Sequence, residues 1–283
     1  MVAQDRSFVR IGPALPTSPL VVSVPHAGRD YPAAMARAMR VPIADIVALE
    51  DRHADALAMA ARTDETMLIQ QRPRAWIDLN RGEHERDPML DDGADPRRQP
   101  APSLKLRSGL GLVPRRVGTV GEIWRGRLRA ADVEARIADD HRPYHAALAQ
   151  ALAAARARFG VAVLVDLHSM PPLGPDAAQI VFGDLFGRSA ATRFVSRIEA
   201  EADAAGIAHA LNTPYAGGHI LDTHAAPTRD IHAVQIEVDR RLYLDAALDA
   251  PGPGLAATAR LLRRMLAALA DEARGAPLPV AAE

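Results

Sequence analysis

The sequence predicts one α/β domain in which helices cover both faces of a mixed, mostly parallel sheet. Short apolar runs rich in β-branched residues alternate along the chain with longer segments of helical spacing. Strands in this order need helical crossovers, which bury both faces of the sheet. The chain has 283 residues, enough for a core without disulfides. No repeat or linker divides it, so we expect a single domain over residues 1–283.

The expected strands are apolar runs that end at turn-forming or polar residues. They cover residues 19–26 (PLVVSVPH), 66–70 (TMLIQ), 75–79 (AWIDL), 161–168 (VAVLVDLH), 178–184 (AQIVFGD) and 232–239 (HAVQIEVD). Pro25, Gly28 and Pro32 end the first of these runs.

Helical spacing predicts the segments that connect the strands. The expected helices cover residues 45–63, 131–159, 190–205 and 255–274. Gly160 and Gly206 follow two of them, where glycine commonly ends a helix. Residues 82–102 are polar and rich in Asp, Arg and Pro, so we expect a long loop region there that extends to about residue 120.

Charge and composition exclude several classes of protein. Lys and Arg total 34 and Asp and Glu total 35, and a net charge of −1 argues against nucleic acid as a partner. The absence of cysteine excludes thiol nucleophiles and cysteine zinc sites, so a metal would need His and carboxylate ligands. Lys105 is the only lysine, and no glycine-rich phosphate-binding loop precedes it.

Targeting signals are not apparent in the sequence. No apolar run reaches the roughly 18 residues of a membrane-spanning helix, and the opening segment MVAQDRSFVRIGP lacks the apolar centre of a signal peptide. We therefore expect a cytoplasmic protein without a membrane partner that acts on a small molecule. The composition does not specify an oligomeric state.

Two histidines stand at the ends of buried strands. His26 follows the run VVSVP, and His168 ends the run VAVLVDLH. Ligands of open α/β sheets bind outside the carboxyl ends of the strands, so the two imidazoles are expected to converge. Asp166 lies two residues before His168 and faces the same side of the strand, where its carboxylate would orient the imidazole.

A third ligand is expected from the segment LEDRHAD. It contains four candidates, Glu50, Asp51, His53 and Asp55. A solvated charged helix face is the alternative interpretation of this segment. Catalytic zinc usually takes three protein ligands, and the two histidines with one of these carboxylates would meet that number.

Glu237 lies between Ile236 and Val238 in an apolar run. A carboxylate in such a place is costly unless it is paired or used in chemistry. Beside a metal ion it would act as a general base toward water and then as an acid toward a leaving amine. A salt bridge to Arg240 or Arg241 is the alternative.

Three residues around the AWIDL run suit the binding of an anionic substrate. Asn80 and Arg81 follow the run, and an arginine fork beside an amide matches the geometry of a carboxylate. Arg74 precedes the run and would stand near a developing oxyanion. An ordinary surface charge is the alternative for each arginine.

Six blocks of sequence, in this order, resemble the N-formylglutamate amidohydrolase family. They are VSVPHAG, LEDRHAD, RAWIDLNR, VDLHSMP, YAGGHI and HAVQIEVDRRLYL, and they span residues 22–244. The resemblance implies a zinc-carboxypeptidase-like fold and hydrolysis of N-formyl-L-glutamate to formate and L-glutamate, a late step of histidine breakdown. It also implies a zinc cofactor, for which another divalent metal is the alternative.

The resemblance also assigns roles to individual residues. His26 and His168 resemble the metal-binding histidines, and Asp51 resembles the acidic ligand, with Glu50 as the alternative. Glu237 resembles the catalytic carboxylate.

The substrate-binding pair follows from the same resemblance. Asn80 and Arg81 resemble the residues by which zinc carboxypeptidases hold a terminal carboxylate. Glutamate has a second carboxylate, for which Arg125 and Arg116 are candidates.

The sequence departs from the carboxypeptidase pattern at Arg29, where that pattern has a glutamate three residues after the first histidine. The acidic ligand must therefore come from elsewhere in the chain.

Two other functions stay open. One is hydrolysis of another N-acyl amino acid or of a small peptide with a free carboxylate. The other is a non-catalytic protein that captures acidic ligands with Asn80 and Arg81.

Overall fold

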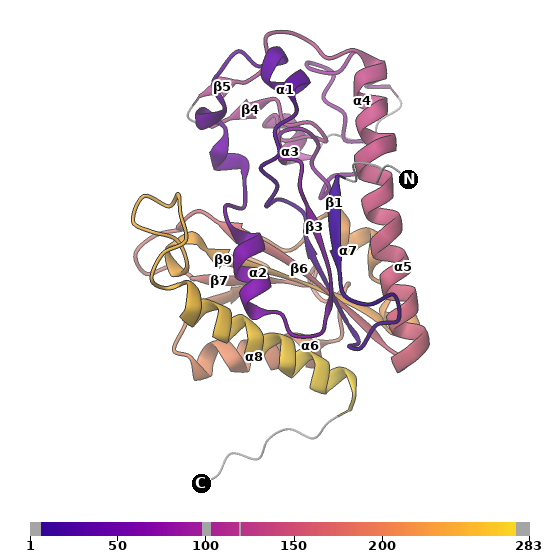
Figure 1. Ribbon diagram of the computed structural model, residues 1–283, viewed down its shortest axis with the longest axis vertical. Helices are drawn as coiled ribbons and strands as arrows, with labels where there is room; N and C mark the ends of the chain where they lie inside the picture. The colour runs from indigo at the N-terminus through magenta and orange to yellow at the C-terminus, as the bar shows by residue number, and fades with distance from the viewer. Residues whose placement is uncertain (1–6, 98–102, 119, 276–283) are drawn as a thin grey trace.

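A seven-stranded mixed sheet forms the centre of the structure, a computed structural model that describes residues 7–97, 103–118 and 120–275 (Figure 1). In spatial order the strands are β1 (Phe8–Ile11), β3 (Thr66–Gln70), β2 (Leu20–Val24), β6 (Ala162–Met170), β9 (Ile231–Asp239), β7 (Ile180–Gly183) and β8 (His209–Leu211). β1 is antiparallel to β3 and β7 is antiparallel to β9, whereas all other neighbours are parallel. The predicted mixed, mostly parallel sheet is therefore confirmed.

Helices cover both faces of this sheet, as predicted (Figure 1). One face carries α2 (Ala54–Ala61), α6 (Thr192–Ala204) and α8 (Leu255–Ala273), and the other carries α5 (Arg142–Phe159) and α7 (His219–His224). Successive residues of β2 contribute to opposite cores, because side chains alternate across a strand: Val22 packs in one core and Val21 in the other. Burial on both faces explains why the central strands are continuous apolar runs.

Residues 75–79 do not form the predicted strand. They lie in turns beside the sheet, and β3 already pairs with β1 on one edge and β2 on the other, so it has no free edge for this segment. Ala75, Ile77 and Leu79 are nevertheless buried in the core. The apolar run therefore reflects burial rather than a strand. It places the residues that follow, Asn80 and Arg81, near the carboxyl ends of the central strands.

Both long helices expected in the first half of the chain are interrupted. Within residues 45–63, a 3₁₀ turn over Val47–Leu49 precedes an extended residue at Glu50 and a left-handed residue at His53 (φ 56°), and α2 begins only afterwards. Within residues 131–159, a π-helical turn over Ile137–His141 separates α4 (Ala130–Arg136) from α5. At both interruptions, polar side chains such as Asp51 and His141 are buried in the interior. A regular helix would have directed them elsewhere.

The expected loop region over residues 82–120 contains short regular elements. These are α3 (Leu104–Arg107) and β4 (Arg116–Val117), which pairs with β5 (Gly121–Glu122). Residues 98–102 and 119 of that region lie outside the described residues. Figure 1 shows α3, β4 and β5 together with α1 (Ala33–Ala38) at the end of the molecule remote from the C-terminus.

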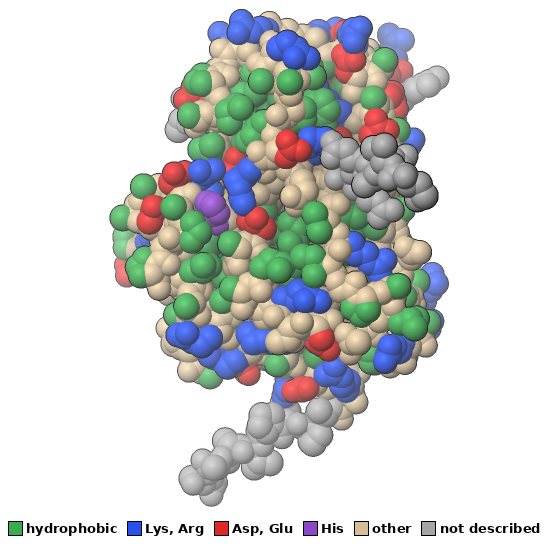
Figure 2. Space-filling model, in the orientation of Figure 1, with side chains coloured by type: hydrophobic (Ala, Val, Ile, Leu, Met, Phe, Trp, Pro, Cys, Tyr) green, Lys and Arg blue, Asp and Glu red, His purple; other side chains and the backbone are tan. Residues whose placement is uncertain are grey.

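The surface agrees with a net charge near zero. Acidic and basic side chains are interspersed over the face shown in Figure 2. Among the described residues, none of the helices combines the length and the apolar character that a membrane span requires.

Candidate metal centre and active site

A cavity of about 550 Å³ lies at the carboxyl ends of β2, β6 and β9. All seven residues predicted to form the site line it: His26, Asp51, Arg74, Asn80, Arg81, His168 and Glu237. A larger cavity, about 990 Å³, lies against β1 and α5 and includes none of these seven. Chemistry rather than size therefore identifies the first cavity as the candidate site.

The two predicted histidines meet at one carboxylate. The Nδ1 atom of His168 lies 2.9 Å from Oδ2 of Asp51, and Nδ1 of His26 lies 3.6 Å from the same oxygen. The two imidazole centroids are 4.8 Å apart. Each of the three residues offers one ligand atom, and these atoms lie within 4.8 Å of one another.

The fold explains how these residues converge. β2 and β6 are parallel neighbours, so His26, just beyond the end of β2, comes close to His168 on β6. Asp51 follows the extended residue before α2, and its backbone N–H donates to the carbonyl of His26 at 2.9 Å. The break in the predicted helix is thus what turns this carboxylate toward the imidazoles.

Outer carboxylates fix the ring orientation of both histidines. Nε2 of His26 lies 2.7 Å from Oδ1 of Asp78, and Nε2 of His168 lies 2.8 Å from Oδ2 of Asp166. Because carboxylates accept, both Nε2 atoms carry a proton. The Nδ1 atoms are then directed toward Asp51, and Nδ1 of His26 is buried without a hydrogen-bond partner. An orphaned imidazole lone pair beside a carboxylate fits a divalent cation.

Charge in the site points the same way. Burial lowers the pKa of His168, but the carboxylates of Asp166 and Asp51 outweigh it and hold this pKa well above its usual value. Burial raises the pKa of Asp51, but the hydrogen bond from His168 and the proximity of both imidazoles outweigh it and hold this pKa well below its usual value. The site therefore concentrates negative charge that a cation would neutralise.

Glu50, the alternative acidic ligand, faces elsewhere. Its carboxylate accepts hydrogen bonds from Tyr31 and Arg52. It does not join the close set of ligand atoms from His26, Asp51 and His168. The geometry thus favours the neighbouring aspartate. Arg29, which replaces a glutamate of the carboxypeptidase pattern, forms a two-pronged ion pair with Asp55 at 3.0 and 2.7 Å.

Glu237 stands beside the candidate ligands. It is paired in register with His168 across β6 and β9, so the two side chains share a face of the sheet. Burial raises its pKa. The alternative salt bridges do not form in the described part of the chain, because Arg240 bonds to Ser169 and Arg241 pairs with Asp239 at 2.6 Å. The carboxylate is therefore available for proton transfer.

The predicted anion-binding residues present donors to the cavity. Nε of Arg74 donates to Asp78 at 2.9 Å, which leaves the end of its guanidinium free, and Nη2 of Arg81 is buried without a partner. Oδ1 of Asn80 accepts from the backbone N–H of Ile220 at 2.9 Å. Nδ2 of Asn80 then faces inward, 3.4 Å from the protonated Nε2 of His168, and has no acceptor there.

The two arginines proposed for a second carboxylate do not reach the site. Neither Arg116 nor Arg125 lines the cavity; Arg116 lies 3.8 Å from Glu122, and Arg125 is exposed. Lys105, on α3, lines it instead. Sequence reasoning missed this residue, although its being the only lysine marked it.

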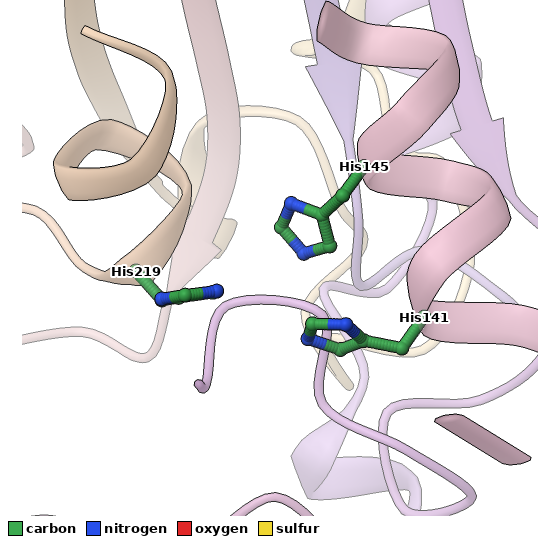
Figure 3. Close-up of side chains that lie close together, drawn as sticks. All are labelled: His141, His145 and His219. Carbon is green, nitrogen blue, oxygen red and sulfur yellow. The ribbon is translucent and has the colours of Figure 1, made fainter. Parts of the chain in front are cut away.

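A second histidine cluster brings together His141, His145 and His219 (Figure 3). Nε2 of His145 donates to the carbonyl of Leu79 at 2.9 Å, and its Nδ1 accepts from His224 at 2.9 Å. Nε2 of His141 donates to the carbonyl of Arg81 at 2.8 Å. These bonds hold the backbone on both sides of Asn80.

This histidine cluster is a poorer metal centre than the first. His141, His145 and His219 also offer nitrogens within 4.8 Å of one another, but both nitrogens of His145 are already engaged. Burial lowers the pKa of His145 to about 2, which keeps its ring neutral. The signal in the sequence was the spacing of four between His141 and His145, which places both on one helix face.

Comparisons with known proteins point to one family. The sequence model of the N-formylglutamate amidohydrolase family matches residues 18–244. The chain is 29% identical to the N-formylglutamate deformylase of Pseudomonas putida over 239 residues, which cover 80% of this chain and 82% of that one. It is 36% identical to the N-formylglutamate deformylase of Pseudomonas aeruginosa over 109 residues, or 36% of this chain and 41% of the relative's length.

Solved structures support the same relationship. The crystal structure of N-formylglutamate amidohydrolase from Ralstonia eutropha JMP134 superimposes with a TM-score of 0.86 at 32% identity, covering 95% of this chain and 99% of that one. A gene product of Agrobacterium tumefaciens shares the fold, with a TM-score of 0.67 at 21% identity over 96% and 98% of the two chains. The resemblance read from the six blocks is confirmed, and the chain belongs to the N-formylglutamate amidohydrolase family.

Proposed function

We propose that the protein hydrolyses the formamide bond of N-formyl-L-glutamate, giving formate and L-glutamate, with a divalent metal held by His26, Asp51 and His168. The observation that carries the proposal is the buried, unpartnered Nδ1 of His26 beside the carboxylate that also faces His168. Family membership supports the substrate. We take zinc as the metal, because two imidazoles and one carboxylate form a common zinc ligand set.

Proton transfer is assigned to Glu237. A divalent ion at this site would supply a Lewis acid that polarises the formyl group and acidifies water. Glu237 takes one proton from the attacking water and later donates it to the nitrogen of the leaving amine. Its raised pKa suits both steps, since the group must accept and then release a proton near neutral pH.

Substrate positioning is assigned to the donors along the cavity wall. Nη2 of Arg81 and Nδ2 of Asn80 would bind the α-carboxylate, which directs the formyl carbon toward the candidate metal ligands. Arg74 carries a free guanidinium end beside Glu237, where it would stabilise the developing oxyanion.

Metal removal and reloading test the proposal directly. We expect chelation to abolish formate release from N-formyl-L-glutamate and added Zn²⁺ to restore it, with Co²⁺ and Mn²⁺ compared because His and carboxylate ligands suit several divalent ions. His26→Ala should lose the metal by elemental analysis, whereas Glu50→Gln should retain it. Full turnover by metal-free protein would refute metal dependence.

A substrate panel tests the choice of substrate. N-acetyl-L-glutamate and short peptides with a free carboxylate represent the other N-acyl substrates left open by the sequence. We expect formate release from N-formyl-L-glutamate to be the fastest reaction. The same proposal places the enzyme late in histidine breakdown, so a strain lacking it should accumulate N-formyl-L-glutamate when it grows on histidine.

A further inference from the structure

We propose that Lys105 binds the side-chain carboxylate of the substrate and so makes the enzyme selective for acyl amino acids with two negative charges. This inference rests on the proposed function, since it names the residue that reads the substrate's second carboxylate. It also replaces the two arginines that the sequence suggested for that role.

The position of Lys105 is the first observation. α3 carries Lys105 to the wall of the cavity that the candidate metal ligands line. Arg81 and Glu237 line the same cavity. In the part of the chain that the structure describes, the Lys105 ammonium forms no hydrogen bond or ion pair, although arginines elsewhere in the protein are widely paired with acids. A cation at a cavity wall without an internal acid is available to a ligand.

The surrounding charge is the second observation. Burial lowers the pKa of Lys105, and the positive charges of Arg81 and Arg74 lower it further. Arg74 and Arg81 share one carboxylate, that of Asp78, at 2.9 and 4.0 Å, and Nη2 of Arg81 has no hydrogen-bond partner. Lys105 and the two arginines thus outnumber the single carboxylate of Asp78 on this wall, and a dianionic ligand would reduce the repulsion between them.

The geometry of the substrate decides which carboxylate each cation takes. The α-carboxylate is attached to the same carbon as the formamide nitrogen, so it must stay close to the reacting group. Asn80, 3.4 Å from His168, and the adjacent Arg81 occupy that inner position. Lys105 lines the cavity but is still partly exposed to solvent, so it lies nearer the mouth, where the two methylenes of the substrate side chain would carry the second carboxylate.

A pair of substrates that differ only in the second charge tests the inference. Lys105→Met, Lys105→Arg and the parent holoenzyme are compared on N-formyl-L-glutamate and N-formyl-L-glutamine. We expect Lys105→Met to lower kcat/KM for the glutamate substrate about tenfold or more, mainly through KM, because a charge-assisted hydrogen bond is lost. For the glutamine substrate the change should stay below about twofold, and Lys105→Arg should keep most of the preference.

Arg107→Met is the matched control, because Arg107 lies on the same short helix, is exposed and does not line the cavity. Arg107→Met should leave kcat/KM unchanged for both substrates. Equal losses on both substrates with Lys105→Met, or no loss on either, would overturn the role of Lys105. A parent enzyme that fails to hydrolyse N-formyl-L-glutamate overturns the proposed function instead.

A binding experiment separates the two failures, because it needs no turnover. Lys105 carries the only ε-amine in the chain, so acetylation of that amine can be followed on a single peptide by mass spectrometry. We expect L-glutamate to slow its acetylation severalfold in the holoenzyme and L-glutamine to have little effect. Equal protection by both amino acids, or protection by neither, would contradict a contact between Lys105 and the second carboxylate.

Discussion

Each imidazole of the candidate metal centre depends on a carboxylate that does not face the metal position. Asp78 holds His26 at 2.7 Å, and Asp166 holds His168 at 2.8 Å. Ser23 in turn donates to Asp166 at 2.8 Å, so this carboxylate is itself fixed. Such outer contacts orient the ring and raise its basicity as a ligand.

Asp78→Asn should therefore weaken metal binding without removing a ligand. We expect metal affinity to fall about tenfold or more, because the amide accepts a weaker hydrogen bond from His26 than the carboxylate does. Competition with a chelator of known affinity measures the loss, and saturating metal should restore much of the activity. Asp55→Asn is the control, since Asp55 pairs with Arg29 outside the cavity. Unchanged affinity in Asp78→Asn would argue against His26 as a ligand.

Glu237→Gln tests the proton transfer. The amide keeps the shape of the side chain but cannot accept a proton from water, so kcat should fall about 10²- to 10⁴-fold. Elemental analysis should show unchanged metal content, because the candidate ligands are His26, Asp51 and His168 and not Glu237. A near-parent rate of formate release with metal bound would exclude the residue as the general base.

At the scale of elements, one face of α5 and its π-helical start hold the segment that follows the AWIDL run. His141 and His145 donate to the carbonyls of Arg81 and Leu79, on either side of Asn80. These donors act as neutral rings, because burial lowers the pKa of His145 to about 2 and that of His224 to about 4. The segment proposed to bind substrate is thus held by groups that do not change charge near neutral pH.

This arrangement predicts an acid limit to stability. The unfolded chain protonates its histidines near pH 6.5, whereas the folded chain keeps His224 neutral to about pH 4 and His145 to about pH 2. The unfolded state binds more protons below pH 6.5, so Tm should fall as the pH is lowered from 6.5 toward 4 and should show no contribution from these groups above 6.5. His224→Gln should make Tm less dependent on pH in that window. An identical dependence of Tm on pH in the variant would contradict a neutral His224 in the folded state.

At the scale of the whole molecule, the candidate ligands come from three separate parts of the chain. His26 follows β2, Asp51 precedes α2 and His168 lies on β6. A metal ion bound to all three would therefore link these segments to one another. Such an ion binds the folded state, because the unfolded chain has no preformed site.

Metal binding should therefore raise the stability of the entire fold. At a free metal concentration about 1,000 times Kd, the gain is about 4 kcal/mol in the free energy of unfolding. Calorimetry of metal-free and reloaded protein measures this gain as a rise in Tm, and Asp51→Asn should lose most of it. A metal-independent Tm would contradict a site shared by distant segments.

The sequence determined the elements that local patterns specify. β2, β6 and β9 are mostly apolar runs, and polar residues stand near their carboxyl ends: His26 just beyond β2, His168 in β6 and Glu237 in β9. These three candidates could therefore be chosen from the sequence alone. The order of the six blocks identified the family in the same way, because the blocks record a site as well as a fold.

Only the tertiary structure decided what depends on contacts between distant residues. The AWIDL run looks like a strand by pattern, but β3 offers it no free edge, and the helix predicted over residues 45–63 breaks to turn Asp51 rather than Glu50 toward the histidines. Lys105 reaches the cavity through the placement of α3, which no local pattern encodes. Periodicity reports which side chains are buried, whereas the partners of a buried charge are fixed by packing in three dimensions.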